Sequence, residues 1–212
     1  GGCTALNSIV IPEGVKSIEF GAFRDCTALK EITIPGSVSA ISKEAFYGCS
    51  SLKSISIPDG VKSIGFLAFS HCTALKSIEI PESVTTIGRR AFRWTRLKRF
   101  PALPPNLKVV EQCAFEDAYC GTLDELRLPD SVEMIESEAF AGVTDHLIVG
   151  KNFRGDLHYI HCYKKLTIPD DNLYLEVRDG FIYKRGTMEL LALMPGAFED
   201  TSESMIRVPE GV

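Results

Sequence analysis

Membrane-spanning segments are absent from the sequence, because none of its 212 residues belongs to a run of about 18 apolar residues. An excess of basic residues is absent too. The 23 Lys and Arg are outnumbered by 28 Asp and Glu, which gives a net charge of −5. This balance argues against a general nucleic-acid binder, since such proteins are usually basic. No signal peptide is visible. Both ends fall inside a repeated pattern, so we interpret the chain as part of a longer protein.

Catalytic motifs are missing as well. The sequence contains no G-x-S-x-G, no H-E-x-x-H and no glycine-rich loop that would hold a phosphate. Paired carboxylates such as those of Glu136 and Glu138 lie outside any predicted cleft. We therefore predict that the protein is not an enzyme and uses no cofactor.

Histidine is scarce, with four in the chain, and two of them stand in the segment HYIHC. His158, His161 and Cys162 offer three ligands for zinc, but a zinc site needs a fourth ligand and a suitable turn. A structural or solvent-exposed role suits these residues better. The sequence thus predicts no metal site.

An internal repeat dominates what is present. The pair Ile-Pro or Leu-Pro recurs with a step of 23 residues and a last step of 25, and the pair Ala-Phe recurs with the same steps. Two independent markers in one register indicate a repeat architecture. The apolar residues before proline are Ile11, Ile34, Ile57, Ile80, Leu103 and Leu128, and the phenylalanines are Phe23, Phe46, Phe69, Phe92, Phe115 and Phe140.

Residues 29–51 show the unit most clearly, as L-x-x-I-x-I-P-x-x-V-x-x-I-x-x-x-A-F-x-x-C-x-x. Its first segment, LKEITIP, alternates apolar and polar residues, which predicts a short strand that ends at Pro35. The segment VSAI at 38–41 predicts a second short strand on the opposite side. The spacing of Ala, Phe and Cys in 42–49 predicts one helical or 3₁₀ turn.

One such unit is too small to form a core, so neighbouring units must stack and share hydrogen bonds and apolar surface. The sequence therefore predicts a repeat solenoid over residues 1–169, with short parallel strands in each coil of about 23 residues. Coil five gains one residue in its strand and coil six gains two around EDAYCGT. Shorter coils are expected near Leu147 and Leu166.

Residues 170–205 break the period. Asp179-Gly180 between apolar runs indicates a β-hairpin, and a second turn at Arg185-Gly186 suggests a further antiparallel strand. We expect a small antiparallel β-hairpin island against the end of the solenoid. Residues 206–212 then restart the repeat.

The unit LKSISIPDGVKSIGFLAFSHC resembles the BspA-like leucine-rich repeat, named for a bacterial surface antigen. The similarity is good over residues 3–140 and loose over 141–169, and DGFIYKRGTMELLALMP resembles the hairpin that interrupts arrays in this family. The resemblance implies a leucine-rich-repeat right-handed superhelix of the α/β type. It also implies a secreted or surface-anchored, extracellular protein of a host-associated microbe, with an adhesin-like role and no catalysis.

Two functions stay open on this evidence. The first is a cell-surface binding protein whose partner is a protein or glycan, including host matrix proteins or receptors, with no nucleic acid and no membrane insertion. The second is a passive structural spacer or scaffold that presents another domain. In a solenoid the inward positions belong to the core, so a binding site is expected on the outward positions of stacked strands.

The outward residue after the first leucine of each strand is lysine in four successive coils, which predicts a basic stripe on the concave strand face. Solvation of an ordinary polar face is the competing interpretation of these charges. Glu31 and Glu79 on the same face would relieve part of the repulsion. The candidate binding residues are Lys30, Glu31, Lys53, Ser54, Lys76, Glu79, Lys98 and Arg99.

Two further features are weighed against plainer interpretations. Cys3, Cys26, Cys49 and Cys72 recur every 23 residues and are predicted to form a buried column of free thiols, whereas a bridge between Cys113 and Cys120 stays open. Arg154, Gly155 and Asp156 form the tripeptide that many integrins bind. A turn with a solvated charge pair is the simpler interpretation of that tripeptide.

Overall fold

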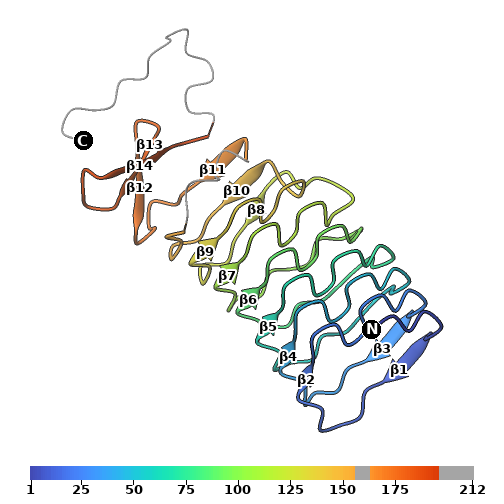
Figure 1. Ribbon diagram of the computed structural model, residues 1–212. Helices are drawn as coiled ribbons and strands as arrows, with labels where there is room; N and C mark the ends of the chain where they lie inside the picture. Colours follow the sequence, from blue (N-terminus) through green and yellow to red (C-terminus); the bar gives the residue numbers. More distant parts are fainter. Residues whose placement is uncertain (156–162, 196–212) are drawn as a thin grey trace.

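The computed structural model is an elongated stack of coils, each lying on the one before it (Figure 1). It describes residues 1–155 and 163–195. The coils are numbered by the inward residue with which each begins, so coils one to eight begin at Leu6, Leu29, Leu52, Leu75, Leu97, Leu123, Thr144 and Tyr163. The predicted repeat solenoid is confirmed.

Fourteen short strands are present in the described residues, and they fall into two parallel ladders along the stack and one antiparallel sheet at its end (Figure 1). They are β1 (Ser8–Val10), β2 (Ser17–Ile18), β3 (Glu31–Thr33), β4 (Ala40–Ile41), β5 (Ser63–Ile64), β6 (Thr86–Ile87), β7 (Val109–Val110), β8 (Leu126–Arg127), β9 (Met134–Ile135), β10 (His146–Ile148), β11 (Lys165–Thr167), β12 (Leu175–Arg178), β13 (Phe181–Lys184) and β14 (Leu190–Leu193).

The second strand of each unit builds the continuous ladder. Strands β2, β4, β5, β6, β7 and β9 form one six-stranded parallel sheet in chain order. Ile18 pairs with Ile41, and Ile41 pairs with Ile64, so equivalent residues of successive coils are direct neighbours. The predicted second strand is therefore confirmed, and it carries the more regular of the two parallel ladders.

The first strand of each unit forms a ladder that is regular only near the two ends of the stack. Strands β1 and β3 pair at the start, and β8, β10 and β11 pair at the far end. Between them, isolated bridges join Ser56 to Glu79 and Leu97 to Tyr119. The middle coils thus hold their first strands together with fewer hydrogen bonds.

The expected helical or 3₁₀ turn at 42–49 is wrong, because the segment forms successive turns and the described residues contain no helix. Its backbone N–H groups donate alternately to carbonyls of the same segment and to carbonyls of the next coil. The Ala45 N–H donates locally to the Ser42 carbonyl, whereas the Phe46 N–H donates to the Ala68 carbonyl of the next coil at 2.8 Å. A helix would direct its later N–H groups to carbonyls of its own segment, whereas stacking directs the Phe46 N–H and its equivalents to the next coil.

Each of these turns contains two residues in the left-handed region, four positions apart. In coil two they are Glu44 (φ 57°) and Gly48 (φ 71°), and in coil four Arg90 (φ 56°) and Trp94 (φ 57°). Glycine is the usual residue at such angles. The coil geometry therefore imposes the angle even where the sequence does not supply glycine.

The core is a single cluster that runs the length of the stack. Its centre is a row of phenylalanine rings from successive coils. Five neighbouring pairs stack nearly face to face, with ring centroids 5.0–5.5 Å apart. The members of the row are Phe23, Phe46, Phe69, Phe92, Phe115 and Phe140.

Strands β12, β13 and β14 form the antiparallel sheet predicted for this part of the chain (Figure 1). Asp179 and Gly180 both have positive φ, 49° and 79°, as a tight two-residue hairpin turn requires. Ile182 and Tyr183 are buried. The domain boundaries at 169 and 205 stay a prediction, and the restart of the repeat at 206–212 lies outside the described residues.

Over the described part of the chain, no helix is long and apolar enough to span a bilayer.

Candidate functional site

The lysine stripe consists of Lys30, Lys53, Lys76 and Lys98, and the structure places these residues in one row. The backbone N–H of Lys53 donates to the Lys30 carbonyl at 3.4 Å, and Lys76 donates to Lys53 at 3.3 Å. Lys98 donates to Lys76 at 2.9 Å. All four residues are exposed. Their alignment follows from the period of the repeat, while their role in binding stays a prediction.

The neighbouring candidates Glu31, Ser54 and Glu79 are exposed on the same strands. In the described residues, neither glutamate lies within ion-pair distance of a stripe lysine. The charges of the stripe are thus offset by solvent and by counter-ions more than by direct pairing.

A hollow opens beside the stripe where coil five follows coil four. The strand of coil five has one extra residue, since six steps separate Leu97 from Leu103 and five separate Leu75 from Ile80. The chain bends after Leu97, and the Phe100 ring packs against the Phe115 ring, with centroids 5.1 Å apart. This bend separates the two strands.

The hollow has a volume of about 490 Å³, and its lining combines apolar residues with two opposite charges, Glu79 and Arg99. Glu79 belongs to coil four and Arg99 to coil five, and both were predicted as binding residues from sequence. The residues that line it are Ser77, Ile78, Glu79, Ile80, Arg99, Phe100, Pro101 and Ala102. Sequence analysis missed the hollow itself, because a single inserted residue does not reveal which way the strand bends.

A second hollow adjoins the first and shares Glu79 and Ile80 with it. It lies between the turns after Ile57 and Ile80, and its acidic residues are Asp59, Glu79 and Glu82. The strand face therefore carries a basic row next to an acidic recess, which favours a partner with charges of both signs.

The described part of the Arg-Gly-Asp segment, Arg154 and Gly155, contacts other residues of the chain. The Arg154 guanidinium forms an ion pair with Glu133 at 2.7 Å and lies over the Tyr174 ring at 5.6 Å. A Cβ on Gly155 would meet the Phe153 ring at 2.9 Å. Asp156 lies outside the described residues. The paired arginine argues against free presentation of the tripeptide.

The two described histidines take part in packing and hydrogen bonding. His146 Nε2 lies 2.9 Å from the Thr167 hydroxyl, and His71 contacts Tyr47 and Trp94 edge to face. His158, His161 and Cys162 lie outside the described residues, so the structure leaves the HYIHC segment as a prediction.

The cysteine column is confirmed for its buried members and wrong for its first one. Cys26, Cys49 and Cys72 are buried free thiols, whereas Cys3 is exposed because no coil covers it on that side. The Cys49 thiol donates to the Phe23 carbonyl at 3.0 Å. Burial raises the pKa of Cys49 to about 12, with smaller effects from Cys26 and Asp25. Burial likewise raises the pKa of Cys72.

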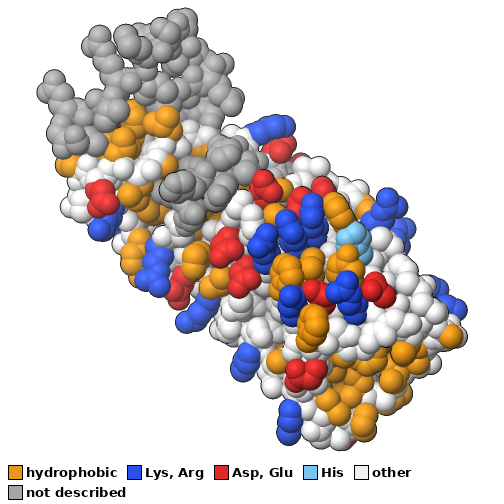
Figure 2. Space-filling model, viewed as in Figure 1, with side chains coloured by type: hydrophobic (Ala, Val, Ile, Leu, Met, Phe, Trp, Pro, Cys, Tyr) orange, Lys and Arg blue, Asp and Glu red, His pale blue; other side chains and the backbone are white. Residues whose placement is uncertain are grey.

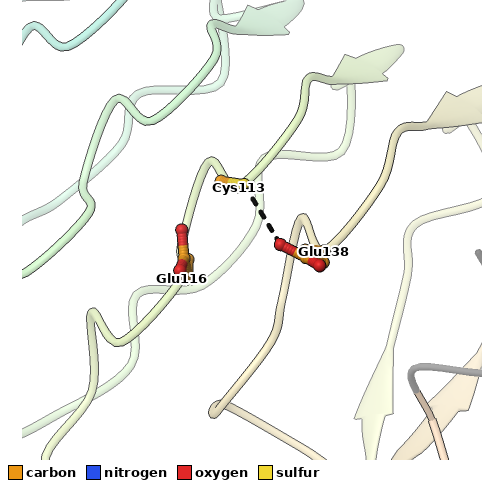
Figure 3. A group of neighbouring side chains, drawn as sticks. All are labelled: Cys113, Glu116 and Glu138. Atoms are coloured by element: carbon orange, nitrogen blue, oxygen red, sulfur yellow. Dashed lines mark hydrogen bonds between the residues drawn. The ribbon is translucent and has the colours of Figure 1, made fainter.

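Cys113 and Cys120 are both free, so the bridge left open between them is not formed. Cys113 instead faces two carboxylates, Glu116 and Glu138, with all three candidate ligand atoms within 4.8 Å of one another (Figure 3). Its thiol donates to Glu138 Oε2 at 3.5 Å. Burial and the two nearby carboxylates raise the pKa of Cys113 to about 11.

This cluster is poorly suited to a cation. Glu116 already forms an ion pair with Arg93, with Nε of the arginine 2.7 Å from Oε2 of the glutamate. A metal would have to displace that arginine and deprotonate a thiol whose pKa is raised. The arrangement is better described as an Arg93–Glu116 ion pair beside a thiol that donates to a second carboxylate, that of Glu138.

Sequence analysis also missed a row of aromatic rings and cations on the turn side of the stack. Lys43 lies over the rings of Phe20 and Phe66, at 5.5 and 5.1 Å. Arg93 lies over the Trp94 ring at 4.0 Å. Figure 2 shows basic side chains gathered with hydrophobic ones around a histidine on one face of the middle coils. The segment RRAFRWTRLKR could have signalled this concentration of charge.

The stacked parallel strands, the shared core and the 23-residue period define a leucine-rich-repeat solenoid. The profile of the BspA type leucine rich repeat region matches residues 1–120 and 117–153 in six copies, and the chain belongs to this family. No curated protein sequence matches it.

Solved structures of bacterial leucine-rich repeat proteins are similar in fold. The Treponema pallidum leucine rich repeat protein has 26% identity and a TM-score of 0.53, with 81% of this chain and 69% of that chain covered. A leucine rich cell surface protein from Faecalibacterium prausnitzii has 23% identity and a TM-score of 0.53, with 88% and 54% covered.

A leucine-rich repeat protein from Bacteroides ovatus has 25% identity and a TM-score of 0.48 over 79% of this chain and 58% of that one. The chain therefore spans little more than half the length of the Bacteroides and Faecalibacterium proteins.

Proposed function

We propose that the chain is the ligand-binding part of an adhesin-like protein at the cell surface or outside the cell. Its partner is a protein or glycan of a host or of a neighbouring cell, and it is bound across several coils on the strand face. Membership of the BspA type family supports a binding role. The structural similarity to a leucine rich cell surface protein shows the fold alone, and the location is part of the proposal.

The observation that carries the proposal is the lysine stripe. Four exposed lysines lie in register on successive coils, and like charges at this spacing repel one another. No carboxylate of the described residues pairs with them. A partner with acidic groups would neutralise the row, and the mixed charges of the adjoining hollows would select among such partners.

A binding screen against matrix proteins and glycans at two salt concentrations tests this proposal. A partner of the stripe should bind more weakly in high salt, since exposed charges are screened. The double variant Lys53→Glu/Lys76→Glu should lose most of the binding. Lys16→Glu/Lys62→Glu changes the net charge equally on the side of the second strands and should bind normally.

Two results would count against the proposal. Unchanged affinity of the stripe variant would remove the strand face as the site. Failure of the wild-type chain to bind any member of the panel would favour the alternative, a spacer that presents another domain.

A further inference from the structure

Six of the eleven residues from 89 to 99 are Lys or Arg, although the whole chain carries a net charge of −5. Four of them belong to the turn side of coil four and are called the arginine cluster: Arg89, Arg90, Arg93 and Arg96. Arg89 and Arg96 are exposed, and Arg90 and Arg93 are half-buried.

The fold neutralises little of this charge. Of the four arginines, Arg93 alone has an ion-pair partner in the part of the chain that the structure describes, and that partner is Glu116. Glu111 of the next coil uses Oε2 to accept a bond from the backbone N–H of Arg89, at 2.8 Å. Nε of Arg90 is buried and has no hydrogen-bond partner among the described residues. The cluster therefore holds donors and charge that no described residue satisfies.

Aromatic rings hold the cluster in place. The Arg93 guanidinium lies 4.0 Å from the Trp94 ring, and Trp94 contacts His71 edge to face at 4.7 Å. Arg89 lies over the Phe66 ring at 6.0 Å. Trp94 keeps 40% of its surface exposed. Guanidinium groups and accessible aromatic surface thus stand side by side on adjacent coils.

This combination fits one ligand chemistry well. Guanidinium groups bind sulfate and carboxylate oxygens through two parallel hydrogen bonds, and exposed aromatic surface covers the apolar face of a sugar ring. We propose that the arginine cluster binds an anionic glycan that carries sulfate or uronate groups. The choice of a glycan over a nucleic acid rests on the proposed cell-surface function.

Heparin serves as the probe, with binding to the full 212-residue chain followed at several salt concentrations. The variant Arg89→Glu/Arg96→Glu changes two exposed residues that have no ion pair within the described residues, so the fold should persist. Its affinity should fall by about tenfold or more, because each lost charge-assisted bond weakens binding. The salt dependence should become shallower. Lys16→Glu/Lys62→Glu is the charge-matched control and should bind as the wild type does.

The aromatic contribution is tested separately with Trp94→Gly. Glycine occupies the equivalent left-handed position at Gly48 and Gly142, so this change suits the backbone. It should weaken binding of heparin more than binding of polyglutamate, since both probes lose the support that the ring gives to Arg93 and only the sugar also contacts the ring. Equal weakening for both probes would overturn the glycan as ligand.

Other outcomes separate this proposal from the one on the strand face. If Lys53→Glu/Lys76→Glu lowers heparin affinity and the cluster variant does not, the strand face is the glycan site and the cluster proposal is overturned. If only the cluster variant lowers it, the cluster proposal stands even where the stripe binds nothing. Tighter binding of single-stranded DNA than of heparin would overturn the choice of a glycan, and no binding of heparin by the wild type would overturn the proposal as a whole.

Discussion

The rings of Phe69 and Phe92 lie parallel, with centroids 5.4 Å apart and planes inclined by 4°. The two residues are 23 positions apart in sequence, and neither side chain is exposed. Each ring has a further ring on its other side, so the stack is continuous through the core. One ring in the middle of this row therefore supports the packing of three coils.

Phe69→Ala should lower the free energy of unfolding by about 3–5 kcal/mol, the usual range for emptying a buried phenylalanine site. Urea denaturation followed by circular dichroism measures the loss. Phe20→Ala is the matched control, because Phe20 is 62% exposed and its removal should change stability little. Similar losses in the two variants would contradict the ring row as the centre of the core.

Gly48 adopts φ 71°, whereas Gly36 has no positive φ and open space around the position of a Cβ. Gly48→Ala should therefore destabilise the protein by about 1 kcal/mol, since the left-handed backbone angle is unfavourable for alanine. A Cβ at this position would also lie 2.4 Å from Asp25 Oδ1, so the aspartate side chain would have to move. Gly36→Ala should be neutral or slightly stabilising. Thermal unfolding of both variants makes the comparison, and a smaller loss at Gly48 would refute the assigned backbone strain.

The buried thiols predict a loss of stability at alkaline pH. The pKa of Cys49 rises from an ordinary 9.0 to about 12 in the folded protein, so the unfolded chain releases this proton first. Stability should be independent of this group below pH 9.0 and should decrease as the pH rises from there toward 12. Denaturation midpoints at about pH 8 and about pH 10 measure the change.

Cys49→Thr supplies the control for this pH effect. Thr95 occupies the equivalent place in coil four, where its hydroxyl bonds the carbonyls of Phe92 and Ala118. Threonine has no proton to release in this range, so the variant should lose less stability between the two pH values. An identical pH dependence in the variant would show that other groups cause it.

The lysine stripe predicts a stabilising substitution. Lys53 lies between Lys30 and Lys76 in the row, so Lys53→Glu replaces two repulsive contacts by attractive ones. The gain should be about 0.2–1 kcal/mol per contact in low salt and should diminish as salt screens the charges. Lys62→Glu is the control, because Ser39 and Thr85 flank that position. No gain at Lys53, or an equal gain at Lys62, would contradict the row as described.

Much of the candidate binding surface could be predicted from the period alone. A fixed step of 23 residues places Lys30, Lys53 and Lys76 on one line whichever way the coil bends, and it does the same for the phenylalanines of the core. The hollow between Glu79 and Arg99 could not be predicted, because it depends on how the extra residue after Leu97 is accommodated.

The sequence by itself determined the repeat, the positions of the short strands and the antiparallel hairpins, because these follow from alternation, turn chemistry and period. Only the tertiary structure decided that the second strands form the continuous sheet and that the Ala-Phe turns are not helical. Stacking assigns alternate N–H groups to the next coil, as the bond from Phe46 to Ala68 shows. Stacking likewise pairs Arg154 with Glu133 and leaves most of the arginine cluster without an ion pair to any described residue. Such pairings depend on which coil lies beside which, and no local pattern in the sequence specifies them.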